Sequence, residues 1–192
     1  GTAKRPASVT RRALAASVQD GAYDALIVID VQTALVAKHP SNEEGFIAAV
    51  SALIDACRSN GVPVVYVLHD GGAGDELERG TDGWQAYAAI APQGGEPCVS
   101  KRFNSAFRRT GLHEMLQSFG AKRLVMCGMQ TEFCFDVSVK VAFELGYDVT
   151  IPREGVTTFD SAFASGEALT AYFEDDIWDG RYAHVAPLDD LV

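Results

Sequence analysis

The sequence predicts an α/β fold, in which a three-layer α/β/α sandwich surrounds a mainly parallel, Rossmann-like sheet. Apolar runs of strand length alternate along the chain with segments of helical periodicity. The runs at 25–30, 62–69 and 123–127 are apolar at successive positions, a pattern typical of strands buried on both faces. Helices that connect parallel strands by right-handed crossovers would cover both faces of such a sheet.

The size and composition of the chain are those of one domain. The chain has 192 residues, of which 47% are hydrophobic and 22% charged. We expect an N-terminal arm over residues 1–22 and a single domain over residues 23–192. The net charge of -10 argues against nucleic acid or an anionic membrane as a partner. No apolar stretch reaches the length of about 20 residues that crosses a bilayer.

The first part of the chain predicts two strands joined by a helix. The run 25–30 predicts the first strand. Ser41 with Glu44 gives the capping-box pattern of a helix start, and residues 60–61 give a helix end. Apolar side chains recur at helical spacing between these signals, and 62–69 then predicts the second strand.

The alternation continues to the end of the chain. The segment 71–83 is rich in glycine and acidic residues and predicts a loop. The later elements are predicted as a short strand at 97–100, a helix from Thr110 to Gly120, a strand at 123–127, a helix at 136–145, a strand at 147–151, a helix at 166–177 and a last strand at 182–185.

Four candidate groups follow predicted strands: Asp30, His69, Lys101 and the turn 128–134. In open parallel sheets, ligands bind beyond the carboxyl ends of the strands, so we expect these groups to meet at one edge. Cys134 would lie in the first turn of a helix. Unpaired backbone N–H groups and the helix dipole favour a thiolate there, which is the nucleophilic form of cysteine.

These residue types suit nucleophilic catalysis by a thiol. Asp30 can take the thiol proton and later pass it to a leaving amine, while Lys101 supplies positive charge beside both groups. The backbone N–H groups of Gln130 and Cys134 are candidate oxyanion donors. A lysine that keeps Asp30 ionised also makes it a poorer acid, and the sequence leaves its working pKa open.

Three motifs carry a family resemblance. They are Val28-Ile29-Asp30-Val31-Gln32, then Ser100-Lys101-Arg102-Phe103-Asn104-Ser105-Ala106-Phe107, then Gly128-Met129-Gln130-Thr131-Glu132-Phe133-Cys134. With this order and spacing, the chain resembles the isochorismatase-like cysteine hydrolases, which include nicotinamidases and several amidases. The similarity runs from about residue 25 to the C-terminus.

The resemblance implies a mechanism and an assembly. It implies a catalytic triad of Asp30, Lys101 and Cys134, and a cis peptide between Met129 and Gln130 that aims the Gln130 N–H at the oxyanion. It also implies cleavage of a carboxamide or related C–N bond through a thioester. Members of the family are usually homo-oligomers, so we expect a dimer or tetramer, with a small-molecule amide as the substrate.

Departures from the family pattern narrow the expected activity. Nicotinamidases carry an Asp-x-His metal site downstream of the catalytic aspartate. Residues 31–45 contain only His39 and no Asp, so we predict no such metal and no other cofactor. Isochorismatases proper lack the nucleophilic cysteine, so Cys134 argues against hydrolysis of a vinyl ether. The motif ending at Cys134 is most similar to a nicotinamidase-related subgroup whose substrates are mostly unassigned.

Candidates for the pocket wall are less specific. His69 ends a strand, and either a substrate contact or a structural hydrogen bond would explain it. Trp84, Phe103, Phe107 and Phe133 are candidates for an apolar wall around a small planar substrate, although aromatic residues in α/β domains are more often part of the core.

Two further hypotheses remain beside the hydrolase. The chain is either an enzyme or a non-catalytic binding or oligomeric scaffold that keeps the triad by descent. A redox-sensing thiol ranks last, because no resolving cysteine is evident near Cys134. The four cysteines show no paired framework, so we expect free thiols in a reducing cytoplasm.

Overall fold

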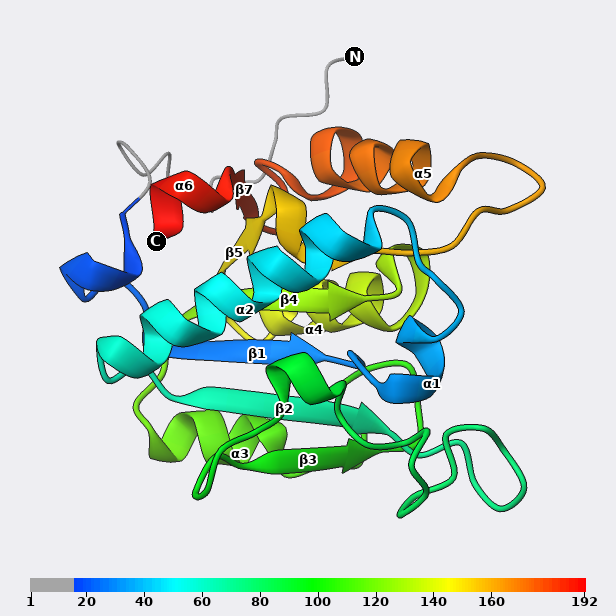
Figure 1. Cartoon of the computed structure of the whole chain (residues 1–192). Helices are drawn as coiled ribbons and strands as arrows, with labels where there is room; N and C mark the ends of the chain where they lie inside the picture. Colours follow the sequence, from blue (N-terminus) through cyan, green and yellow to red (C-terminus); the bar gives the residue numbers. More distant parts are fainter. Residues whose placement is uncertain (1–15) are drawn as a thin grey trace.

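A seven-stranded sheet forms the middle layer of the structure, a computed structural model that describes residues 16–192. All pairs between its strands are parallel, which confirms the predicted sheet (Figure 1). The order in space is β3-β2-β1-β4-β5-β7, with β6 beside β4. The strands are β1 (Ala25–Ile29), β2 (Val64–His69), β3 (Cys98–Lys101), β4 (Arg123–Met129), β5 (Asp148–Pro152), β6 (Val156–Thr157) and β7 (His184–Ala186).

Helices cover both faces of the sheet. In Figure 1, α2 crosses in front of the sheet, whereas α3 and α4 lie behind it. The α-helices are α1 (Thr33–Val36), α2 (Glu43–Ser59), α3 (Leu112–Ser118), α4 (Asp136–Glu144), α5 (Gly166–Tyr172) and α6 (Leu188–Leu191). Single turns of 3-10 helix form η1 (Val18–Asp20), η2 (Ala88–Ile90) and η4 (Arg153–Gly155), and π-helical turns form η3 (Thr131–Phe135) and η5 (Phe173–Trp178). Among the described residues, none of these helices is long and apolar enough to cross a membrane.

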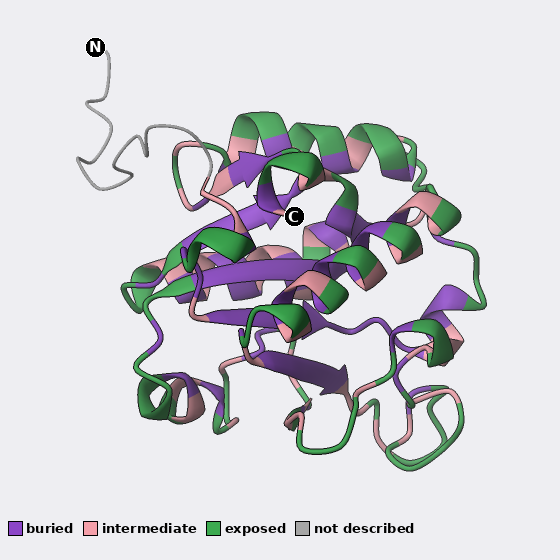
Figure 2. Ribbon diagram, turned by 60° about the vertical axis from the view of Figure 1, so that its left-hand side comes forward, coloured by how far each residue is buried: buried purple, intermediate pink, exposed green. Residues whose placement is uncertain are grey.

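The alternation of side chains along β1 divides the core into two layers. Leu26 and Val28 pack in the cluster that contains the apolar face of α2. Ala25, Ile27 and Ile29 pack in the cluster that contains α3 and α4. Both faces of β1 are therefore buried, which explains its unbroken apolar sequence (Figure 2).

The N-terminal segment enters the structure as a packed turn. Residues 1–15 of the expected arm lie outside the described residues. Ser17 caps η1, and Val18 is buried in the cluster that contains α2.

Two helices differ in detail from their predictions. The capping box of Ser41 and Glu44 does not form, because α2 begins after Asn42 without a side-chain cap. The Ser41 N–H instead donates to the Thr158 carbonyl at 2.9 Å. The helix predicted over 166–177 changes from α to π geometry at Phe173.

The strand order of the sheet reverses between β1 and β4, which is where a ligand site is expected. From β1, the chain moves outward to β2 and β3 on one side and then returns to β4 on the other. The crevice between the carboxyl ends of β1 and β4 is the usual ligand position in such folds. Gly128 lets the two strands approach there: its φ is +134°, and a Cβ would lie 2.1 Å from the Ile29 carbonyl oxygen.

We expect Gly128→Ala to destabilise the fold by about 3 kcal/mol or more, because it combines an unfavourable φ with a clash against backbone. Chemical denaturation measures the loss. Gly120→Ala is the matched control: Gly120 also has a positive φ of +65°, but nothing lies within 4 Å of its added Cβ. The control should lose about 1 kcal/mol of its free energy of unfolding. Equal losses in the two variants would refute the close approach.

Candidate active site

Asp30 leaves the end of β1 in a left-handed backbone conformation. Its φ is +54°, a region that Asp tolerates better than most residues. Its N–H donates to the Val67 carbonyl at 2.9 Å, which continues the pairing of β1 with β2. Only 2% of the residue is exposed, so its carboxylate lies beneath the surface at the switch point of the sheet.

Lys101 joins the elements of the site. It ends β3, and only 1% of the residue is exposed. Its Nζ lies 2.9 Å from Asp30 Oδ2 and donates to Cys134 Sγ at 3.2 Å. The same nitrogen lies 2.8 Å from His69 Nδ1 and 3.1 Å from the Phe103 carbonyl oxygen. The structure thus brings together the three side chains that the motifs predict as a triad.

Cys134 lies on a π-helical turn rather than in the first turn of an α-helix. This turn, η3, follows β4 and precedes α4, and Phe133 within it has non-helical angles of φ -116° and ψ -107°. The peptide between Met129 and Gln130 is cis, as the resemblance implies. The Cys134 thiol donates to Asn104 Oδ1 at 3.5 Å and accepts from Lys101.

The electrostatics of the site act against the expected thiolate. Burial raises the pKa of Cys134 to about 12, and the Asp30 carboxylate adds to this effect, while Lys101 opposes it. Desolvation and a nearby negative charge thus oppose the thiolate that the dipole argument from sequence favours. Cys134 therefore rests as a protonated thiol.

Asp30 has the properties of a buried base. Burial raises its pKa, against the opposing effect of Lys101. Desolvation therefore outweighs the cation in its effect on the Asp30 pKa. Its Oδ1 is enclosed and has no hydrogen-bond partner among the described residues. One carboxylate oxygen is thus held by Lys101, and the other remains available for a proton.

Gln32 fixes His69 beside this group. The Gln32 Oε1 accepts from the His69 N–H at 3.0 Å, and its Nε2 donates to the His69 carbonyl at 3.0 Å. The same Nε2 donates to the Trp84 carbonyl at 2.9 Å. A fully buried side chain thereby holds the end of β2 and the following loop in register.

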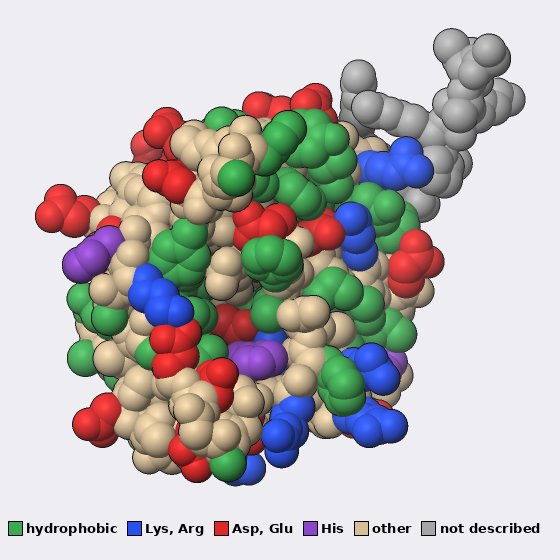
Figure 3. All heavy atoms as spheres, turned by 90° about the vertical axis from the view of Figure 1, so that its right-hand side faces the viewer, with side chains coloured by type: hydrophobic (Ala, Val, Ile, Leu, Met, Phe, Trp, Pro, Cys, Tyr) green, Lys and Arg blue, Asp and Glu red, His purple; other side chains and the backbone are tan. Residues whose placement is uncertain are grey.

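A cavity of about 350 Å³ opens onto these groups. This volume is within the usual range for small-molecule sites. Figure 3 looks onto this edge of the sheet, where acidic side chains gather around a hollow. The lining comprises Asp30, Leu35, Lys38, His69, Gly71, Asp75, Glu76, Leu77, Asn104, Gln130, Phe133 and Cys134.

Only one of the four predicted aromatic wall residues reaches the cavity. Phe133 lines it and is 56% exposed. Phe107 stacks on Tyr147 at 6.2 Å between ring centroids, and Phe103 lies under the Arg108 guanidinium at 3.8 Å. The indole nitrogen of Trp84 is enclosed without a hydrogen-bond partner among the described residues. The structure does not bring Trp84, Phe103 or Phe107 to the cavity.

Several cavity residues are ones that the sequence analysis did not single out. Asn104, which lines the cavity, lies within the second motif, and Gln32, which holds the His69 backbone, lies within the first, so the motifs were the available signal. Lys38 and Glu76 form an ion pair at the mouth although 38 positions separate them. No sequence pattern predicts that pair, because it depends on how the loop after β2 folds back onto the segment after α1.

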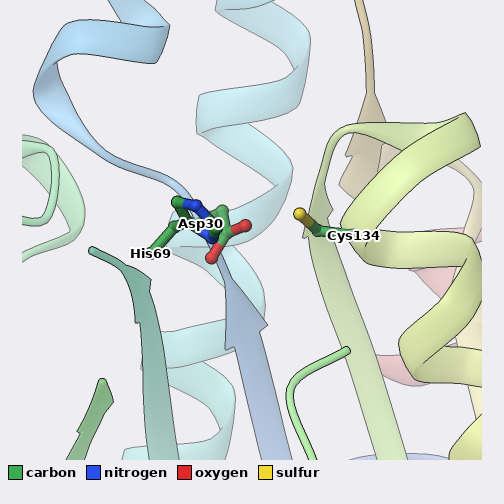
Figure 4. A group of neighbouring side chains, drawn as sticks. All are labelled: Asp30, His69 and Cys134. Carbon is green, nitrogen blue, oxygen red and sulfur yellow. The ribbon is translucent and has the colours of Figure 1, made fainter. Parts of the chain in front are cut away.

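The donor atoms of Asp30, His69 and Cys134 lie within 4.8 Å of one another, a spacing that a metal ion would require (Figure 4). The Lys101 ammonium, however, contacts all three groups at 2.8–3.2 Å. A second cation there would be repelled. His39, the candidate from the Asp-x-His comparison, is exposed and pairs with Glu43. These residues do not fit a metal, and its absence stays a prediction.

Comparison with known proteins identifies the family. Residues 24–174 match the Isochorismatase domain family model. The chain belongs to the isochorismatase family. A solved isochorismatase from Pseudomonas putida KT2440 superposes with a TM-score of 0.83 at 28% identity and covers 95% of each chain. This likeness confirms the predicted fold class.

Curated relatives of this isochorismatase-family chain include hydrolases. A streptothricin hydrolase of Streptomyces noursei is 32% identical over 71% of this chain and 50% of the relative. Nicotinamidase 3 of Arabidopsis thaliana is 30% identical over 78% of this chain and 80% of the relative. The chain therefore spans about half the length of the streptothricin hydrolase that it matches.

The Cys134 thiol should not ionise below about pH 10, because its raised pKa keeps it protonated at lower pH. Thiolate absorbance is measured against pH for the wild type and for Cys134→Ser, and the difference between the two curves should show no step in this range. The subtraction isolates Cys134 from the other three cysteines. A difference step near neutral pH would show instead that Lys101 and the turn outweigh burial and Asp30.

Proposed function

We propose that the chain is a cofactor-independent cysteine hydrolase that cleaves a C–N bond of a small amide through a thioester. One observation carries the proposal: the Lys101 ammonium contacts both the Asp30 carboxylate and the Cys134 sulfur beside an open cavity. Membership in a family with hydrolase and amidohydrolase relatives supports the reaction class.

The first step forms the thioester. Cys134 Sγ attacks the amide carbonyl carbon while its proton moves to Asp30, whose raised pKa makes it a competent acceptor. A C–S bond forms and the carbonyl oxygen becomes an oxyanion. The backbone N–H groups of Gln130 and Cys134 stabilise that charge. The tetrahedral intermediate collapses as the C–N bond breaks, and Asp30 returns the proton to the leaving amine or ammonia.

The second step hydrolyses the thioester and releases the carboxylic acid product. Asp30 takes a proton from water as the water oxygen attacks the thioester carbonyl. The C–S bond then breaks, and the sulfur regains its proton from Asp30. Lys101 stabilises the carboxylate when Asp30 is ionised and the sulfur when it leaves as a thiolate. The same ammonium thus favours each charged form in turn.

A non-catalytic scaffold is the second candidate, and the raised pKa of Cys134 is the observation that favours it. A resting thiol with so high a pKa is a weak nucleophile unless Asp30 takes its proton during attack.

We also propose that the chain works as a homo-oligomer in the cytoplasm. Exposed Phe163, Phe119 and Leu145 support association, and the four free thiols support a reducing compartment.

Cys134→Ala should abolish ammonia release from small amides and leave the unfolding midpoint close to that of the wild type, because the side chain is nucleophile rather than core. A screen over nicotinamide, pyrazinamide, ureido acids and N-carbamoyl amino acids supplies the assay. Cys98→Ala, at an exposed cysteine, is the control and should retain full activity. Turnover by Cys134→Ala would exclude the thioester mechanism.

Asp30→Asn should lower kcat by about 10²- to 10⁴-fold, because the proton carrier is lost. Asn is the suitable replacement since it tolerates the left-handed backbone that this position requires. Asp55→Asn, at an exposed position of α2, is the control and should leave kcat unchanged. Circular dichroism verifies that both variants fold. An unaffected kcat in folded Asp30→Asn would remove Asp30 from the mechanism.

A further inference from the structure

The hydrogen bonds of Lys101 determine where His69 carries its proton. A lysine ammonium donates up to three hydrogen bonds and has no lone pair with which to accept one. The contact between Lys101 Nζ and His69 Nδ1, at 2.8 Å, therefore requires Nδ1 to accept. An imidazole that accepts at Nδ1 is neutral and carries its hydrogen on Nε2.

The Nε2–H of His69 has no hydrogen-bond partner within the described part of the protein. The ring is half-buried and lines the cavity wall. Among residues 16–192, no hydrogen-bond partner approaches Nε2, and this atom is not one of the fully enclosed polar atoms. Figure 4 shows the ring at the end of β2, beside Asp30 and on the side toward Cys134. The site thus contains a donor without a partner among the residues that the structure describes.

This donor is held in place at two ends. Lys101 holds the ring through Nδ1, and the Gln32 amide holds both the N–H and the carbonyl of the His69 backbone. A polar group held in this way loses little conformational entropy when it binds a ligand, which is the property expected of a recognition group.

The surrounding charges keep the imidazole neutral. Burial lowers the pKa of His69, and Lys101 lowers it further, while Asp30, Asp75 and Asp70 act in the opposite direction. Cys134, which lies within reach of the same group, is a protonated thiol and adds no charge. Because the net shift is downward, the neutral Nε2–H form extends to lower pH than in an unperturbed histidine and is lost as the pH falls through the lowered pKa.

On the basis of the proposed function, we propose that His69 orients the substrate by donating its Nε2–H to a second, uncharged acceptor atom of the amide. The scissile oxygen is assigned to the Gln130 and Cys134 amides, so the acceptor for His69 is a different atom. Asp75 and Glu76 at the mouth disfavour a carboxylate there, since Lys38 is already paired with Glu76. The substrate class is therefore a small neutral amide with a ring nitrogen or an ether or keto oxygen.

The tautomer is tested first, by long-range proton–nitrogen correlation spectra of the ¹⁵N-labelled full chain. We expect His69 to be neutral with its hydrogen on Nε2, and Lys101→Met to release this tautomer preference. A spectrum of the wild type at pH 7 that shows a charged ring or an Nδ1–H ring would overturn the proposal. Thermal denaturation verifies that Lys101→Met folds; His69→Asn serves to assign the signal.

Recognition is tested by the alkylation rate of Cys134 with matched chloroacetamides, so no turnover is needed. The sulfur displaces chloride and its proton passes to solvent through Asp30. The probes are the N-phenyl compound and its three N-pyridyl isomers, with each rate divided by that of free cysteine. We expect the wild type to favour one pyridyl isomer by about tenfold, the value of one hydrogen bond.

His69→Asn should remove that preference, so that each pyridyl rate equals the phenyl rate measured for the same variant. Asn keeps an acceptor near the position of Nδ1 for Lys101 but offers no donor where Nε2 stood. His184→Asn, at a histidine on β7 whose ring approaches Asp179, is the control and should keep the preference. No preference in the wild type, or one that survives in His69→Asn, would overturn the proposal. Equal slowing of all four probes would indicate a structural role only and would also overturn it.

These readouts are independent of hydrolysis. If the tautomer and the pyridyl preference hold but no amide releases ammonia, the proposed hydrolase fails while the recognition role of His69 stands. If ammonia release depends on Cys134 but the preference is absent, the hydrolase stands and the recognition role fails.

Discussion

The buried ammonium of Lys101 is the interaction on which the site depends. A buried charge is costly unless it is paired and hydrogen-bonded, and here four groups surround one nitrogen: Asp30, His69, Cys134 and the Phe103 carbonyl. They come from the ends of β1 and β2, from the turn after β4 and from the segment after β3. Because one buried cation needs these partners, the carboxyl ends of β1, β2, β3 and β4 are held in a single arrangement.

The same ammonium sets the electrostatics of the reaction proposed above. Burial raises the pKa of both Asp30 and Cys134, and Lys101 opposes both shifts without cancelling either. A cysteine that rests as a thiol beside a base is less exposed to adventitious oxidation than a resting thiolate. Nucleophilicity would then appear only when a substrate carbonyl is present to accept the sulfur.

Specificity resides outside this central group. The floor of the cavity comes from strand ends, whereas its mouth comes from α1, the residues after it and the loop after β2. The mouth combines the Lys38–Glu76 pair with apolar Leu35 and Leu77. Loops of this kind vary readily while the sheet that carries the chemistry is retained. His69 is the exception, because it belongs to the sheet and yet lines the cavity.

The sequence by itself predicted six of the seven strands, the main helices that cover the sheet and the group at its edge, but it contained no signal for β6. Asp30 and the turn that carries Cys134 follow runs that are apolar at successive positions, Lys101 follows a short predicted strand, and parallel strands place such ends together. These are local periodicities and a general rule of topology, so one chain suffices to predict them. The capping box at Ser41 failed because a tertiary partner, Thr158, takes the backbone of that residue.

Only the tertiary structure decided the protonation of the site and the composition of its wall. The thiol of Cys134 is protonated because of burial and of Asp30, two effects that depend on distances the sequence does not contain. Phe103 and Phe107 turn away from the cavity, and Asn104 between them turns toward it. Desolvation and side-chain direction are properties of the assembled fold, since both depend on neighbours that are remote along the chain.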